Sequence, residues 1–104
     1  MKLLKLTPAD TCSVVEIEEF DIDRQLDQMY RCIDCDTIDI VRIPYTNRCL
    51  IVDDNGLLRG FALNLAASLM AGRPIVGTVL LGCIRHTDEG DMITSYQGEI
   101  EPDH

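Results

Sequence analysis

Short apolar runs alternate with polar turns along the whole chain, and this pattern predicts the secondary structure. Residues 2–6 and 14–18 have the length and apolar content of strands, and a turn sequence around Pro8 separates them. The first eighteen residues therefore predict a hairpin with a long loop.

The next apolar positions recur with the spacing of one face of a helix. They are Ile22, Leu26, Met29, Tyr30 and Ile33. Steps of three and four residues are typical of a buried helical face. Asp21 or Asp23 can serve as the N-cap, because a carboxylate accepts hydrogen bonds from the first backbone amides and suits the positive helix start. We therefore expect an amphipathic helix here.

Residues 37–43 and 48–53 are two further apolar runs, and a break containing Pro44 separates them. They predict a second hairpin. Asn55 and Gly56 come directly after it, and these residue types readily supply the positive φ of a tight turn. We therefore expect a turn at residues 54–56.

A short helix is predicted over residues 65–71. Asn64 precedes it as a plausible N-cap and Gly72 follows it at the C′ position, with Pro74 just beyond. Helix boundaries of this kind can be located from sequence because the residue types have specific roles at each end.

Residues 75–84 form a long apolar run that predicts the central strand. Gly77 and Gly82 lie within it, and glycine inside a strand marks a bulge or a close backbone approach. Residues 91–96 are compatible with a last strand or a short helix. We expect residues 99–104 to be a disordered tail.

The order β-β-α-β-β-α-β predicts an α+β fold with a mainly antiparallel sheet and two short helices. The chain has 104 residues, and a chain of this size buries roughly 60–70% of its unfolded surface. We therefore expect a single domain over residues 1–98.

The charge of the chain narrows the classes of partner. It has 9 basic and 18 acidic residues, a formal net charge of −9, and only 5% aromatic residues. Basic side chains that neutralise phosphates dominate nucleic-acid affinity and attraction to anionic membranes. We therefore expect no direct binding to DNA, RNA or membranes, and the charge instead suits a basic partner.

The chain lacks the marks of secretion and of membrane insertion. Its first residues are too short and too interrupted for the apolar region of a signal peptide, and no apolar run approaches 18 residues. The five cysteines have no disulfide-framework spacing. We therefore expect a cytoplasmic protein with reduced cysteines.

The block over residues 48–81 resembles a known family. Its matching residues are Asp53, Asn55-Gly56, Leu57-Leu58-Arg59-Gly60, Asn64, Ala67-Ser68 and Gly72-Arg73-Pro74-Ile75-Val76-Gly77. They resemble the short phage- and plasmid-borne proteins with "domain of unknown function 3846". Two positions depart from that pattern: Thr78 replaces an acid, and Leu65 replaces a proline. Residues 1–43 match more weakly but in the same order.

The resemblance implies an accessory protein of a phage or plasmid in the cytoplasm of a bacterial host. By analogy, small proteins of this kind counter host defence by binding a defence protein or by sequestering a nucleotide signal. The resemblance itself assigns no chemistry to any residue.

Three further segments resemble chemical sites, but a structural role explains each of them better. Cys32 and Cys35 form a C-x-x-C, but a zinc site needs two more ligands and a redox pair belongs at a helix start; small buried side chains are the simpler interpretation.

The acidic turn before Gly56 fails the calcium-loop pattern. The segment from His86 to Asp91 could hold a metal weakly or transfer protons, but a solvated loop explains it. We expect no enzyme activity, no metal and no cofactor.

The remaining candidates are basic and amide side chains at the ends of the central elements. The predicted ligand-binding residues are Arg48, Arg59, Asn64, Arg73, Asn47 and Tyr45. Arginine makes bidentate contacts with phosphate and asparagine hydrogen-bonds base edges. If folding brings them together, they would bind a small phosphorylated ligand. Otherwise the arginines are ordinary surface cations that balance an acidic chain.

Two functions follow from these observations. The first is a non-enzymatic protein that binds and sequesters a small nucleotide-like ligand, and for this function we expect a homo-oligomer. The second is an acidic interaction module that regulates or inhibits a host protein, by nucleic-acid mimicry for example. The second predicts carboxylates gathered on one surface, such as Glu16, Glu18, Asp23, Asp27 and Asp39.

Overall fold

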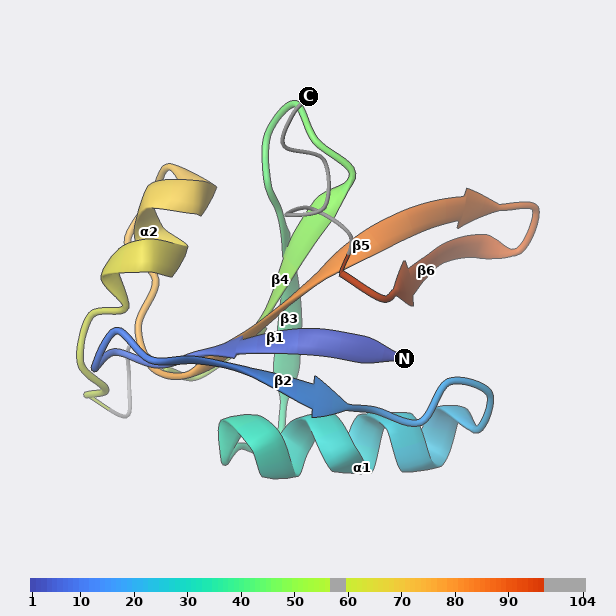
Figure 1. Cartoon of the computed structure of the whole chain (residues 1–104), viewed down its shortest axis with the longest axis horizontal. Coiled ribbons are helices and arrows are strands. Elements are labelled where there is room, and N and C mark those ends of the chain that lie inside the picture. Colours follow the sequence, from blue (N-terminus) through green and yellow to red (C-terminus); the bar gives the residue numbers. More distant parts are fainter. Residues whose placement is uncertain (57–59, 97–104) are drawn as a thin grey trace.

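The computed structural model describes residues 1–56 and 60–96, which form six strands and two helices. In chain order these are β1 (Lys2–Leu6), β2 (Cys12–Glu16), α1 (Ile22–Ile33), β3 (Ile38–Arg42), β4 (Arg48–Asp53), α2 (Leu65–Ala71), β5 (Val79–Thr87) and β6 (Gly90–Thr94) (Figure 1). This order confirms the predicted succession of elements, and β6 shows that a strand, not a helix, follows residue 90. The predicted tail, residues 99–104, lies outside the described residues.

The strands form one antiparallel sheet, which confirms the α+β prediction. Their order is β2-β1-β5-β4-β3, and β6 pairs with β5 beyond this path. The first half of β5 pairs with both β1 and β4, and its second half pairs with β6. β5 is therefore the central strand, as its apolar sequence predicts.

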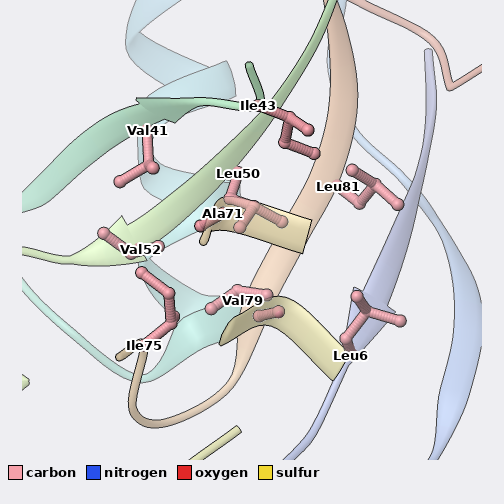
Figure 2. Close-up of a cluster of buried hydrophobic side chains, with 10 residues drawn as sticks. Leu6, Val41, Ile43, Leu50, Val52, Ala71, Ile75, Val79 and Leu81 are labelled. Atoms are coloured by element: carbon pink, nitrogen blue, oxygen red, sulfur yellow. The ribbon is translucent and has the colours of Figure 1, made fainter. Parts of the chain in front are cut away.

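The two helices cover opposite faces of the sheet (Figure 1). Successive residues of a strand point to opposite faces, so each strand contributes to two separate cores. The core beneath α2, shown in Figure 2, is Leu6, Val41, Ile43, Leu50, Val52, Ala67, Ala71, Ile75, Val79 and Leu81. The core beneath α1 is Leu3, Ile17, Met29, Ile33, Ile51 and Leu80. None of the helices in the described ranges is long and apolar enough to cross a membrane.

α1 begins, and α2 begins and ends, at residues that the sequence predicts as caps. Asp21 is the N-cap of α1, because its carboxylate accepts hydrogen bonds from the amides of Asp23 and Arg24 at 3.1 and 3.3 Å. Asn64 caps α2 in the same way, and Gly72 ends α2 with a φ of 72°. Local hydrogen bonds set these boundaries, which is why the sequence reveals them.

The ranges of β2 and β5 differ from the prediction because pairing partners set them. β2 begins at Cys12, not at residue 14, since Cys12 pairs with Leu6 across the hairpin. β5 runs from residue 79 to 87 and not from 75 to 84. Residues 75–78 instead bind the segment before α2, where the amide of Asn64 donates to Ile75 and the amide of Gly77 donates to Ala62.

The turn at residues 54–56 forms, but its predicted cause is wrong. Neither Asn55 nor Gly56 has a positive φ. A Cβ on Gly56 would instead lie 3.0 Å from a methyl group of Val76. Glycine therefore fits the close approach of two chain segments here, since a larger residue would require the Val76 side chain to shift.

Candidate functional site

The predicted basic residues divide between the two ends of β4. Arg48 begins the strand, and its guanidinium lies 5.4 Å from the ring centre of Tyr96. Arg73 lies near the other end, where it lines a cavity with Asp53 and Asp54. A strand rises about 3.3 Å per residue, so the ends of this six-residue strand are roughly 16 Å apart. Arg59 lies outside the described residues.

Asn47 and Tyr45 accompany Arg48 in the turn between β3 and β4. The Tyr45 side chain is fully exposed, and its backbone has a φ of 64°. The backbone carbonyl of Asn47 accepts a hydrogen bond from the amide of Ile84 at 2.6 Å. These three predicted residues are brought together by adjacency in the chain, and Arg48 among them contacts Tyr96 in the described structure.

The side chain of Asn64 is buried inside the fold. Its amide nitrogen donates to the carbonyls of Leu6 and Gly77 at 3.1 and 2.9 Å, and its oxygen accepts from the amide of Ala67 at 3.2 Å. Both amide hydrogens and the oxygen are thus used within the protein. Asn64 connects α2 to β1 and to the loop before β5, and it presents no polar group to a ligand.

The cavity beside Arg73, which we call the Arg73 cavity, has a volume of about 520 Å³. Val41, Val52 and Ile75 form part of its apolar wall, and three acidic residues, Asp39, Asp53 and Asp54, also line it. Among the described residues that line the cavity, one guanidinium lies with three acidic residues, which gives this part of the lining a net negative charge. That charge disfavours a phosphate group and suits a cation.

A second hollow lies between the start of α1, β3 and β6, and we call it the α1 groove. Its volume is about 380 Å³. It is lined by Phe20, Ile22, Ile40 and Met92, whose side chains are 90%, 60%, 43% and 46% exposed. Glu19 and Asp91 also border it. Large side chains exposed together around one hollow are typical of a binding surface.

Sequence reasoning missed the α1 groove, although one signal for it exists. Phe20 directly precedes the N-cap Asp21, where an apolar residue usually packs against the fourth residue of the helix. That fourth position holds Gln25, whose side chain instead donates to the carbonyl of Glu18 at 3.1 Å. Phe20 therefore lacks this packing partner and remains exposed.

The predicted acidic surface is only partly assembled. Glu16, Glu18, Asp23 and Asp27 lie along the segment from β2 into α1, whereas Asp39 is on β3 at the opposite end of the sheet. Glu18 also has a local structural role, since its carboxylate accepts the amides of Phe20 and Asp21 at 3.2 and 3.3 Å. These hydrogen bonds lower the pKa of Glu18.

His86 and Asp91 face each other across the β5–β6 hairpin. The Asp91 carboxylate binds the Nδ1 atom of His86 and the guanidinium of Arg42. All three side chains are well exposed. Within residues 1–56 and 60–96 no group of three His, Cys, Asp or Glu side chains is arranged to hold a metal ion.

The cysteines occupy mainly structural positions. Cys32 and Cys35 are half-buried at the end of α1 and pack against the core beneath that helix. Cys49 is fully buried in β4, and burial raises the pKa of its thiol to about 11. A thiol with this pKa stays protonated at neutral pH and is a poor nucleophile.

Comparison with known proteins gives a family and no function. The family model described as Domain of unknown function (DUF3846) matches residues 1–101. No curated protein and no solved structure matches the chain. The family match spans all six described strands, both helices and the block over residues 48–81 that carries the resemblance. The chain therefore belongs to the DUF3846 family.

Proposed function

We propose that this protein is a non-enzymatic interaction module that binds a segment of another protein in the α1 groove. The observation that carries the proposal is the exposure of Phe20, Ile22, Ile40 and Met92 around one hollow. Water-exposed side chains of this size gain free energy when a partner covers them, at about 25 cal/mol per Å² of apolar surface. An exposed phenylalanine is also a suitable anchor for a protein contact.

The charge around the groove indicates the kind of partner. Glu19 borders the groove, and Glu18, Asp21 and Asp23 belong to the same stretch of chain. The whole chain has a net charge of −9. A partner segment with apolar side chains flanked by lysine or arginine therefore matches both the groove and its border.

Site-specific cross-linking tests this proposal. A photo-reactive phenylalanine analogue at position 20 is expected to capture a partner from the host lysate. The same analogue at position 69 is the control, because Leu69 is 76% exposed on α2, away from the groove. The affinity of the purified partner should then fall at least about tenfold with Phe20→Ser, the usual effect of losing an interface anchor. Equal losses with Phe20→Ser and Leu69→Ser would contradict the proposal.

Sequestration of a nucleotide-like ligand stays a prediction. Arg73 reaches a cavity of suitable size, but the carboxylates around it oppose a phosphate, and Arg48 lies at the far end of β4. Thermal-shift measurements with cyclic and linear nucleotides, on the wild type and on Arg73→Ala, would test it. Stabilisation of the wild type alone would favour this function over the interaction module.

A further inference from the structure

β3 ends the sheet on one side, and its outer edge has no strand partner among residues 1–56 and 60–96. The amide of Ile43 donates to Arg48 and the amide of Asp54 donates to Thr37, at 3.0 and 3.2 Å. In an antiparallel pair, hydrogen-bonded residues alternate with residues whose backbone groups point the other way. The backbone groups of Ile38, Ile40 and Arg42 therefore point away from β4, toward the open edge.

Each face of β3 borders one of the two hollows. Ile38 and Ile40 line the α1 groove, and Asp39 and Val41 line the Arg73 cavity. This division follows from the alternation of side chains along a strand. A segment lying beside β3 would place its own alternate side chains over the same two hollows.

We propose that β3 accepts a segment of the partner protein as an additional antiparallel strand, with apolar side chains over the α1 groove and lysine or arginine side chains over the Arg73 cavity. This inference rests on the proposed function and specifies how the partner binds. Backbone hydrogen bonds to Ile38, Ile40 and Arg42 would supply affinity. The two hollows would supply selectivity for an alternating apolar and basic sequence.

Asp39 makes the open edge selective. Its carboxylate accepts the amide of Ile40 at 2.9 Å, so it occupies a backbone donor that an incoming strand needs. Charged residues on an edge strand commonly prevent unwanted pairing. A basic side chain opposite Asp39 would attract the carboxylate and release this amide for the partner. An acidic segment would be repelled by Asp39 and Asp54, and a second copy of this chain brings a further net charge of −9.

A synthetic peptide with the alternating sequence Lys-Val-Lys-Val-Lys-Val-Lys, blocked at both ends, is the probe for this inference. We expect it to bind, to shift the NMR amide signals of Ile38, Ile40 and Arg42, and to slow the hydrogen exchange of Ile40. The matched peptide with glutamate in place of lysine should not bind. A lysine–valine peptide of the same composition without alternation should bind at least about tenfold more weakly, because it cannot satisfy both faces.

Methylation of the peptide backbone tests the pairing directly. Residues opposite Ile38 and Ile40 share their face of the sheet, so the valine amides of the probe point toward β3 and the lysine amides point to solvent. N-methylation of the valines should therefore abolish binding, and N-methylation of the lysines should preserve it. Equal tolerance of both modifications would show that no strand is added.

Variants of the protein complete the test. Asp39→Lys should reverse the preference, so that the glutamate–valine peptide binds and the lysine–valine peptide does not. Asp36→Lys is the matched control, because Asp36 is exposed just before β3 and does not line the Arg73 cavity. If both variants keep the wild-type preference, the inference fails.

Two outcomes separate this inference from the proposed function. Loss of partner binding in Phe20→Ser, together with equal tolerance of both methylated peptides, would keep the groove as the binding site and overturn strand addition. Slow hydrogen exchange of Ile40 in a dimer without any peptide would assign the edge to a second copy and overturn the inference too.

Discussion

At the scale of the residue, the sequence can predict one role of a side chain correctly and another role of the same side chain wrongly. Asn64 is recognisable as a helix N-cap because the cap depends on the amides of the next three residues. Its bonds to Leu6 and Gly77 depend on chain segments that only folding brings near. Asn64, which was predicted to bind a ligand, is therefore buried and joins α2 to β1 and to the loop before β5.

Replacing Asn64 with alanine should lower the free energy of unfolding by about 2–4 kcal/mol, from the lost cap and the carbonyls left without donors. Urea unfolding followed by circular dichroism would measure this loss. Asn47→Ala is the control, because this substitution removes only an exposed side chain. It should change the free energy of unfolding by no more than about 0.5 kcal/mol. Equal effects of the two variants would contradict the assigned role.

Deprotonation of the Cys49 thiol makes the free energy of unfolding depend on pH in the alkaline range. Burial raises the pKa of its thiol to about 11 in the folded protein, above the value in the unfolded chain. The unfolded state therefore loses its proton first, so this contribution is present below the unfolded pKa and is lost as the pH rises toward the folded pKa. We expect the free energy of unfolding to fall between about pH 9 and pH 11.

The comparison of wild type with Cys49→Ala across that pH range isolates this contribution. Removal of the buried thiol should flatten the alkaline decline, whatever its effect on stability at neutral pH. Cys12→Ala should keep the decline, because Cys12 is exposed. An unchanged slope in Cys49→Ala would contradict the assignment to this thiol.

At the scale of the element, the sequence predicts the boundaries of helices more accurately than the boundaries of strands. α1 and α2 begin and end at residues whose own side chains or backbone conformation close them, as Asp21 and Gly72 do. The ends of β2 and β5 depend on Leu6 and on the segment before α2, which are distant in the sequence or irregular in structure. Non-local pairing therefore limits how well strand boundaries follow from the chain alone.

Gly82 is the strand residue whose predicted role is confirmed. It lies where β5 meets both β1 and β6, and a Cβ there would approach a Leu3 methyl group to 2.7 Å and the Thr94 carbonyl to 3.0 Å. Gly82→Ala should lower the free energy of unfolding by about 1–3 kcal/mol, the usual cost of overpacking. Thermal and urea unfolding would measure it.

Ser13→Ala serves as the matched control for Gly82→Ala. Ser13 is an exposed residue of the edge strand β2, and its replacement should change stability by no more than about 0.5 kcal/mol. An unchanged free energy of unfolding in Gly82→Ala would mean that β1 and β6 can move apart without cost. The close approach at Gly82 would then contribute nothing to stability.

At the scale of the whole molecule, the excess of acidic residues opposes folding and shapes binding. Folding brings carboxylates closer together, and a net charge of −9 creates self-repulsion in the compact state. The same field disfavours phosphate ligands and favours basic partners. The proposed binding mode uses this field at Asp39 and Asp54, beside the open edge of the sheet.

Salt should therefore stabilise the protein. Raising the NaCl concentration from about 0.02 M to about 0.2 M shortens the screening length severalfold and weakens the repulsion between carboxylates. We expect the thermal midpoint to rise, as measured by scanning calorimetry. Choline chloride should act equally, since screening does not depend on the identity of the cation. A falling midpoint would show that ion pairs such as Arg42 with Asp91 outweigh the repulsion.

Patterns along the chain predict the α+β class, the order of the elements, both helices and the apolar run that supplies the central strand. These depend on hydrophobic periodicity and on helix caps, which act over a few residues. The separation of Arg48 from Arg73, the burial of Asn64 and the groove shared by Phe20 and Ile40 become visible only in the folded chain. The physical reason is that a binding surface depends on which distant segments pack together, and sheet pairing sets that arrangement.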